Sequence, residues 1–370
     1  MVFGLLKTDN FIRFVIGQRD CVPSIVLYNE RQISDIKSFC FDRRAGSVLA
    51  FDKTFNLGAV YVTPSVYKNV ALNRIRSDDQ PIFLGPVFIH GKSDFETYAH
   101  FFGHLSGRLA GMDFQSLTLG SDDEKSIRKC MMHYFYRAAT VACSRHLREN
   151  VGRKLDELVG KSSDIRRRLM DSIFGTTGLV TLDNITSFDT AIERLRATDG
   201  LLASGPADFR HYFDTRIVPL MRDNCVAGLG SWTNNNCESM NHVLKQAVQW
   251  RPNQVPDLID KLRSIVDGQF AEADRAMIGR GDFVLRPDWA KHRLTFDCWS
   301  KMSTVQRQKA VSACFRLPSV PTSTSSDGAV DVPTTPGGGK KLNQKKRCRT
   351  ERTTTVSKRV KLSCDDAVIE

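Results

Sequence analysis

Residues 46–55 read Gly46-Ser-Val-Leu-Ala-Phe51-Asp52-Lys-Thr54-Phe55, and this stretch decides the fold. Residues 48–51 are an unbroken apolar run, which is typical of a central strand covered on both faces. An acid at the end of such a run either begins a turn or has a chemical role. Two further carboxylates in matching settings favour the chemical role for Asp52.

Length and composition bound the kind of protein. The 370 residues and 41% hydrophobic content allow one large domain or two, plus tails. Ten cysteines are scattered without a Cys-x-x-Cys pair, which predicts reduced thiols in a reducing compartment. The sequence has no apolar run long enough for a membrane span, and its first residues are too briefly apolar for a secretory signal. We therefore expect an intracellular protein with no membrane partner.

The formal net charge of +12 is concentrated near the C-terminus. Residues 340–361 contain ten lysines and arginines against one acid, Glu351. The rest of the chain is close to neutral, so a DNA-binding face on the globular part must come from local clusters such as Arg166-Arg167-Arg168.

Three apolar runs predict three sequential strands in an antiparallel meander: residues 46–51, 59–63 and 81–90. Residues 56–58 contain a turn signal between the first two strands, and Pro64 is expected to end the second. Residues 74–79 are polar and are expected to form a linker.

Helical and strand periods alternate after the meander. A helix is expected over residues 94–112 with Ser93 or Asp94 as its N-cap, and a second over residues 123–135. Strands are expected at residues 116–120 and 138–143. The predicted order is βββαβαβ.

The chain is thereby divided into five segments. They are a lead-in segment (1–45) with two candidate strands and a helix, the first part of the core (46–143), a helical insertion (144–230), C-terminal helices that complete the core (231–317) and a disordered basic tail (318–370).

The second acid, Asp122, directly follows the predicted fourth strand. An alternative interpretation is structural, because Ser121-x-x-Glu124 matches a capping box and acids in a first helical turn complement the helix dipole.

The third acid, Glu238, lies on a predicted helix over residues 232–250. Glu238, Asn241, His242 and Lys245 share one face of that helix by spacing. The alternative is a solvated polar stripe opposite an apolar face. That apolar face is expected to comprise Met240, Val243, Leu244, Ala247 and Val248.

Convergence of Asp52, Asp122 and Glu238 at one edge of a βββαβαβ sheet resembles the RNase H-like fold, an α/β fold with a mixed sheet. Three hard oxygen ligands suit Mg²⁺ or Mn²⁺, and two such ions can activate an attacking oxygen and stabilise a leaving oxygen in phosphoryl transfer. The expected chemistry is cleavage or joining of phosphodiesters.

Four motifs in order extend this likeness to a family. They are Asp52-x-Thr54-Phe55, Ser121-Asp122-x-Glu124, Cys143-x-x-His146-Leu-x-x-Asn150 and Asn235-x-x-Glu238-Ser239-x-Asn241. Over roughly residues 20 to 270 the chain resembles Mutator-like (MULE) transposases. Asp52 and Asp122 are separated by 70 residues and Asp122 and Glu238 by 116 residues, and the family places a helical insertion in the second interval.

The resemblance implies a DDE catalytic domain in which Asp52, Asp122 and Glu238 bind Mg²⁺ or Mn²⁺ in a two-metal site. It implies transposon-end and target DNA as partners, and a homo-oligomer as a further possibility. Thr54, Cys143, His146, Asn235 and Asn241 belong to the family motifs. Cys143 and His146 form only half a zinc site, and core packing is the alternative reading of that pair.

Three hypotheses follow for function. The first is a metal-dependent transposase that cuts and transfers DNA strands. The second is a transposase-derived, non-catalytic nuclear DNA-binding or regulatory protein, because the zinc-stabilised DNA-binding module that such transposases carry ahead of the catalytic domain is not found in these residues. The third is an RNase H-like nuclease.

The basic tail predicts nuclear import. The basic residues fall in short clusters typical of a nuclear address, which implies the nuclear import machinery as a partner. They are Lys340, Lys341, Lys345, Lys346, Arg347, Lys358, Arg359 and Lys361. A fusion of residues 337–370 to a reporter should accumulate in the nucleus, and a cytoplasmic fusion would contradict the prediction. If the tail is instead a DNA-binding arm, its deletion should flatten the salt dependence of DNA affinity.

Overall fold

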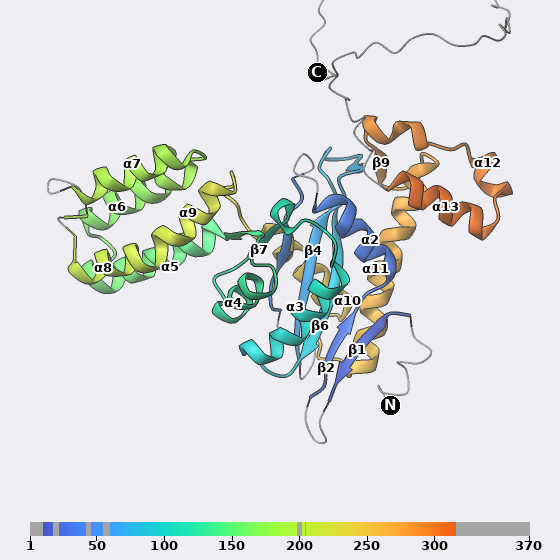
Figure 1. The fold of residues 1–370 in the computed structure, drawn as a ribbon, viewed down its shortest axis with the longest axis horizontal. Coiled ribbons are helices and arrows are strands. Elements are labelled where there is room, and N and C mark those ends of the chain that lie inside the picture. The colour runs from blue at the N-terminus through green and yellow to red at the C-terminus, as the bar shows by residue number, and fades with distance from the viewer. Residues whose placement is uncertain are drawn as a thin grey trace, which may run out of the picture. The chain divides into compact units, whose positions relative to one another are not determined.

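The computed structural model describes residues 10–17, 22–41, 46–54, 60–197, 202–203 and 205–315. In these residues the chain is a mixed α/β protein with helices on both faces of a central sheet (Figure 1). None of the described helices combines the length and the apolar character needed to cross a bilayer.

Seven strands in the described part of the chain form the central sheet. They are β1 (Ile12–Ile16), β2 (Ser24–Leu27), β3 (Leu49–Phe51), β4 (Tyr61–Lys68), β6 (Ile82–His90), β7 (Thr118–Ser121) and β8 (Ala139–Ala142). Their order across the sheet is β1-β2-β6-β4-β3-β7-β8. Neighbours from β1 to β3 are antiparallel, whereas β3, β7 and β8 run parallel. All three residues of β3 are buried, as its apolar run predicts.

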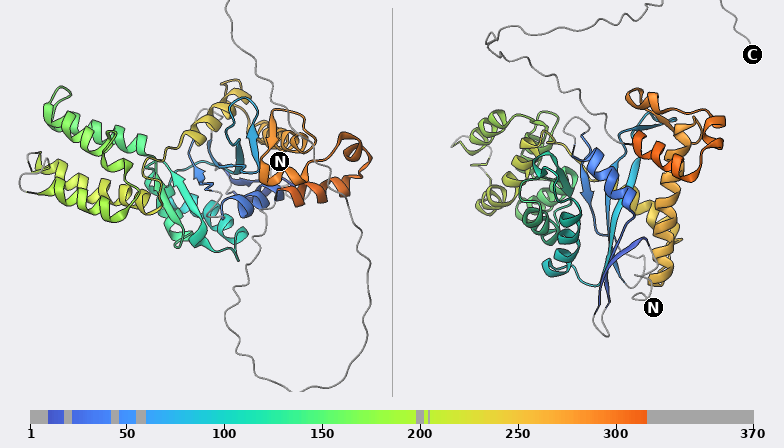
Figure 2. Two further views of the ribbon diagram at one scale, coloured as in Figure 1. Left: turned by 90° about the horizontal axis from the view of Figure 1, so that it is seen from above. Right: turned by 45° about the vertical axis from the view of Figure 1, so that its right-hand side comes forward.

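Five helices pack on the sheet: α2 (Glu30–Phe39), α3 (Phe95–Arg108), α4 (Lys125–Tyr134), α10 (Asn235–Ala247) and α11 (Val255–Met277). Contacts between aromatic rings show which helix covers which face of the sheet. Phe88 stacks on Phe101 of α3 at 5.2 Å between centroids, whereas Phe83 meets Phe270 of α11 at 5.8 Å. Figure 2 shows these two helices on opposite faces of the sheet.

The chain between β8 and α10 forms the helical insertion, seen in green to yellow in Figure 1. It contains α5 (Ser144–Val159), α6 (Asp164–Phe174), η2 (Leu179–Thr181), α7 (Ile185–Arg196), α8 (Ala207–Tyr212), a π-helical turn η3 (Phe213–Ile217) and α9 (Val218–Val226). These helices pack around a hydrophobic cluster of their own.

Buried Asn224 of α9 joins the insertion to the sheet. Its Nδ2 donates to the backbone oxygen of Ala142, and its Oδ1 accepts from the Ala142 N–H, each at 2.8 Å. The side chain therefore pairs with the edge strand β8 as a neighbouring strand would.

Two short strands absent from the sequence prediction form a second sheet. β5 (Leu72–Arg74) pairs with β9 (Phe283–Leu285), so the expected polar linker is partly a strand. The remaining elements are η1 (Phe114–Ser116), η4 (Pro287–His292), α12 (Phe296–Lys301) and α13 (Thr304–Cys314).

The predicted meander is confirmed, because β3, β4 and β6 pair antiparallel in that order. The N-cap at Asp94 is also confirmed, because its Oδ1 accepts from the Thr97 N–H at 2.8 Å. The expectation that Pro64 ends its strand is wrong. Proline lacks an N–H, but the register shifts between Pro64 and Val66, and this irregularity lets β4 continue to Lys68. The predicted turn at residues 56–58 lies outside the described residues.

Candidate active site

The register of the parallel strands places Asp52 beside Asp122. Phe51 pairs with Ser121, and Ser121 pairs with Ala142 on the next strand. The residues that follow these three positions therefore emerge together at the carboxyl edge of the sheet, where α/β proteins usually place their ligands. Those residues are Asp52, Asp122 and Cys143.

The segment that leads into α10 is tied to this edge. Buried Asn234 donates its Nδ2 hydrogen to the backbone oxygen of Phe51 at 3.4 Å, and its N–H reaches the Cys143 sulfur at 3.3 Å. Trp232 covers Gly120 so closely that a Cβ on this glycine would lie 2.5 Å from the indole. Only glycine leaves room for the ring, so α10 begins at a defined point over the acids.

Asn241 of α10 bonds the helix directly to one of the acids. Its Nδ2 donates to Asp52 Oδ2 at 2.8 Å, and only 8% of the residue is exposed. Spacing alone predicts Asn241 on the polar face of this helix and Val243 on its apolar face. That assignment is wrong, because Val243 is 41% exposed. The carboxylate of Asp52 supplies a buried polar partner, so an amide occupies a core-facing position of the helix.

The two aspartates are in an environment that disfavours their charged forms. Burial, then the neighbouring carboxylates of Asp122 and Glu238, raise the pKa of Asp52 to about 7. Burial also raises the pKa of Asp122, and Glu124 adds to this, while the backbone N–H of Glu124 acts in the opposite direction.

The capping box expected at Ser121 and Glu124 is wrong. The Ser121 hydroxyl donates to the backbone oxygen of Asp122 at 2.8 Å, and Asp122 Oδ1 accepts from the Glu124 N–H at 3.2 Å. Helix α4 begins only at Lys125. The Glu124 carboxylate instead accepts from Tyr98 and pairs with Lys53 Nζ, each at 3.0 Å. Tertiary partners for Glu124 thus replace the local cap.

Glu238 lies in the first turn of α10 and faces a different partner. Its carboxylate accepts a hydrogen bond from Arg145 at the start of α5. It is nevertheless near enough to raise the pKa of Asp52. Among the residues that the structure describes, no three His, Cys, Asp or Glu side chains are gathered closely enough to hold one metal ion.

A dication fits two of the three predicted ligands as they stand. Asp52 and Asp122 are half-buried and follow paired residues, and the charge of Asp122 adds to the desolvation that raises the pKa of Asp52, a repulsion that a cation would relieve. Asn241 Oδ1 is buried without a hydrogen-bond partner, although its Nδ2 is bonded to Asp52. Glu238 fits only after it leaves Arg145.

Cys143 and His146 lie together at the start of α5. The Cys143 sulfur, as a hydrogen-bond partner, raises the pKa of His146 to about 9. Burial acts to raise the pKa of Cys143, but hydrogen bonds from His146 and the Asn234 N–H lower it overall. Cys143 is 1% exposed, in keeping with a packed position. Cys237 is buried whereas His242 is exposed, so these two do not face one site.

The other motif residues have different environments. The Thr54 N–H donates to the Val62 oxygen at 2.8 Å and prolongs the β3–β4 pairing, while its hydroxyl is buried without a partner. Asn235 is exposed at the start of α10. The predicted nuclear-targeting residues and the boundary at 318 lie outside the described residues.

Sequence reasoning missed Lys53, Asn234 and Arg145 as parts of this edge. Lys53 and Asn234 sit next to motif residues, and this adjacency was the available signal. Arg145 sits within the Cys-x-x-His motif, but its partner Glu238 is 93 residues away, so only the fold reveals the pair.

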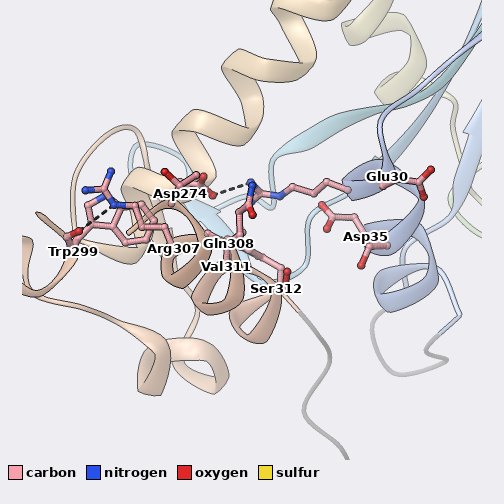
Figure 3. A pocket seen from close by; sticks show the side chains of 12 residues that line it. Glu30, Asp35, Asp274, Trp299, Arg307, Gln308, Val311 and Ser312 are labelled. Carbon is pink, nitrogen blue, oxygen red and sulfur yellow. Dashed lines mark hydrogen bonds and ion pairs between the residues drawn. The ribbon is translucent and has the colours of Figure 1, made fainter. Parts of the chain in front are cut away.

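A cavity of about 720 Å³ lies elsewhere, between α2, α11 and α13, and none of the three predicted acids lines it (Figure 3). Several of its charged side chains have partners within the protein. Arg31 pairs with Asp274 at 2.8 Å, and Arg307 Nε donates to the Trp299 oxygen at 3.1 Å. Asp35 accepts from a tyrosine hydroxyl at 3.0 Å. These bonds give the cavity a structural explanation.

Comparison with models of known protein families gives no match, and comparison with curated protein sequences gives none either.

The raised pKa of Asp52 predicts a pH-dependent stability. Its ordinary pKa is 3.8 and its folded pKa is about 7, so the stability that it contributes is complete below about pH 4 and is lost as the pH rises through 7. Without metal at pH 8, Asp52→Asn should therefore raise the melting temperature by on the order of 5 °C, and the gain should vanish near pH 4.

Thermal unfolding across this pH range tests the expectation. Asparagine can still accept the Asn241 hydrogen bond, so the substitution removes mainly the charge. Asp123→Asn is the matched control, because Asp123 pairs with Arg216 and should show no gain at pH 8. An Asp52→Asn gain that does not depend on pH would contradict the assigned cause.

Proposed function

We propose that this chain is a Mutator-like DDE transposase domain with an RNase H-like fold, which carries out metal-dependent cleavage and transfer of DNA strands. The strand order β6-β4-β3-β7-β8 supports the fold, because three antiparallel strands are followed by two parallel ones as in the predicted βββαβαβ core. The insertion between β8 and α10 supports the family, which places helices in that interval.

One observation carries the proposal. Asp52 and Asp122 follow paired residues on adjacent parallel strands, and a helix that bears Glu238 is hydrogen-bonded to Asp52 through Asn241. Elements 189 residues apart in the chain are thus brought to one pair of half-buried acids. A structural role does not require such acids, because desolvation and, for Asp52, the charge of Asp122 raise their pKa values and cost stability.

Asp52, Asp122 and Glu238 would hold Mg²⁺ or Mn²⁺. When bound, two such ions supply an activated oxygen nucleophile and stabilise the leaving oxygen of a phosphodiester. The residues of the chain orient this site: Asn241 fixes the Asp52 carboxylate, and Lys53, paired with Glu124, places a cation near Asp122.

Arg145 links the site to its substrate. Its side chain is 46% exposed, and its guanidinium pairs with Glu238. A phosphate of bound DNA competes for that guanidinium, because arginine binds phosphates by paired charge-assisted hydrogen bonds. Glu238 is then released to join Asp52 and Asp122. In this proposal the partners are transposon-end and target DNA and a second copy of the chain, and the location is the nucleus.

The Arg145–Glu238 pair also favours a second candidate, a transposase-derived nuclear protein that binds DNA without cutting it. In that case the ion pair is permanent and the third acid never reaches the other two. The two candidates differ in a single measurable property, metal-dependent nicking of DNA by the purified protein.

Asp52→Asn, Asp122→Asn or Glu238→Gln should each abolish nicking of supercoiled DNA in Mn²⁺ while the fold is retained. An amide keeps a carbonyl oxygen but loses the negative charge needed to hold a dication. Circular dichroism checks the fold. Asp123→Asn is the neighbouring control and should retain most activity. Equal losses at Asp122 and Asp123, or full cleavage by Glu238→Gln, would leave the non-catalytic candidate ahead.

Arg145→Gln should strengthen Mn²⁺ binding in the absence of DNA, because it frees Glu238. Exposed ion pairs are worth about 0.2–1 kcal/mol, so the Mn²⁺ concentration for half of the thermal stabilisation should fall about 1.5- to 5-fold. Arg148→Gln is the control, since this exposed residue lies one turn further along the same helix. An unchanged Mn²⁺ dependence in Arg145→Gln would mean that Glu238 is not a ligand.

A further inference from the structure

Trp250, just beyond the end of α10, is an exposed aromatic side chain. Its exposed fraction is 59%. All four tryptophans lie in the described part of the chain, and the other three, at positions 232, 289 and 299, are partly or fully buried. The backbone under this ring and the side chains around it indicate what the exposed face could bind.

The backbone that presents this ring is strained. Gln249 and Trp250 both have left-handed conformations, with φ of 53° and 58°. The Trp250 N–H donates to the Lys245 oxygen at 2.9 Å, and the Gln249 N–H to the Gln246 oxygen at the same distance. Helices that end with this pattern usually place glycine at the first left-handed position. Here Gln249 and Trp250 both adopt this conformation although they are not glycine. Such strained residues are concentrated at ligand-binding sites.

Two side chains of α10 face the Trp250 ring. The His242 ring lies at 5.5 Å between centroids in an edge-to-face arrangement, and Lys245 Nζ lies 5.9 Å from the ring centre. Arg251 is exposed immediately after the ring. Residues 239–256 contain no acid at all. The surroundings of the ring are therefore polar and basic, which complements a polyanion.

The ring follows the helix that carries the third acid. Trp250 lies three residues beyond the end of α10, and Glu238 lies in the first turn of the same helix. Because Asn241 of the same helix is bonded to Asp52, the position of the ring is coupled to the candidate active site.

We propose that Trp250, with His242 and Lys245, is a stacking site for an unpaired base of single-stranded DNA. The inference rests on the proposed function, because the stacking site would hold the end of a DNA strand for the candidate active site. Aromatic rings flanked by cations bind single strands by stacking on bases and by attracting phosphates. Bases within a duplex are stacked on each other and offer no free face, so the site selects single-stranded over double-stranded DNA.

Fluorescence anisotropy of the full-length protein with a labelled 15-nucleotide oligothymidine and with a duplex of equal length tests this. The buffer contains EDTA, so that neither metal binding nor cleavage contributes. Trp250→Ala should weaken binding of the single strand about 5- to 150-fold, the range for loss of one stacked base, and leave duplex binding unchanged. Trp250→Phe should retain most of the affinity.

Tyr136→Ala is the matched control, because Tyr136 is 78% exposed and follows a different helix. It should bind both DNAs as the wild type does. Equal losses of single-strand and duplex binding in Trp250→Ala would overturn the stacking site. Unchanged binding of both DNAs would also overturn it, and would favour a protein partner for this ring. Nicking in Mn²⁺ tests the catalytic proposal and binding in EDTA tests the stacking site, so failure of the one and failure of the other give different results.

Discussion

The parallel pairing of β3 with β7 is the constraint on which the rest of the structure depends. Its register aligns Phe51 with Ser121, so the next residue on each strand is an aspartate at the same edge. Hydrogen bonding along the backbone fixes this register, and a slip of one residue would send one carboxylate to the opposite face of the sheet. The sheet therefore holds two like charges together although their repulsion opposes folding.

Long-range hydrogen bonds then bring a helix from the far end of the chain to this edge. Asn234 reaches the Phe51 backbone across 183 residues, and Asn241 reaches Asp52 across 189 residues. Both amides are buried, so loss of either would leave polar groups without water or partners.

Ion pairs at the rim set the charge state of the edge. Lys53 pairs with Glu124 and Arg145 pairs with Glu238, while His146 acts against the rise in the pKa of both half-buried aspartates. The two ion pairs differ in burial. Lys53 and Glu124 are mostly buried, whereas Arg145 is nearly half exposed and can exchange partners with a ligand. Exposed pairs are weak, which makes the second one suitable for exchange.

The sequence by itself determined those elements whose signals are local. The apolar run before Asp52, the strand that became β6 and the Asp94 cap depend on neighbouring residues, and the structure has all three. The α/β class and the antiparallel meander follow from the order of such runs. The proximity of Asp52 and Asp122 was likewise expected, because each directly follows a predicted strand of the βββαβαβ sheet.

Only the tertiary structure decided features that depend on partners distant in the chain. Pro64 remains within β4 because a register shift accommodates it, and Asn241 is buried because Asp52 receives its hydrogen bond. Glu124 pairs with Lys53 and not with a helix terminus, and Glu238 pairs with Arg145. In each case the local pattern was compatible with two arrangements, and a contact with a residue distant in the chain selected one.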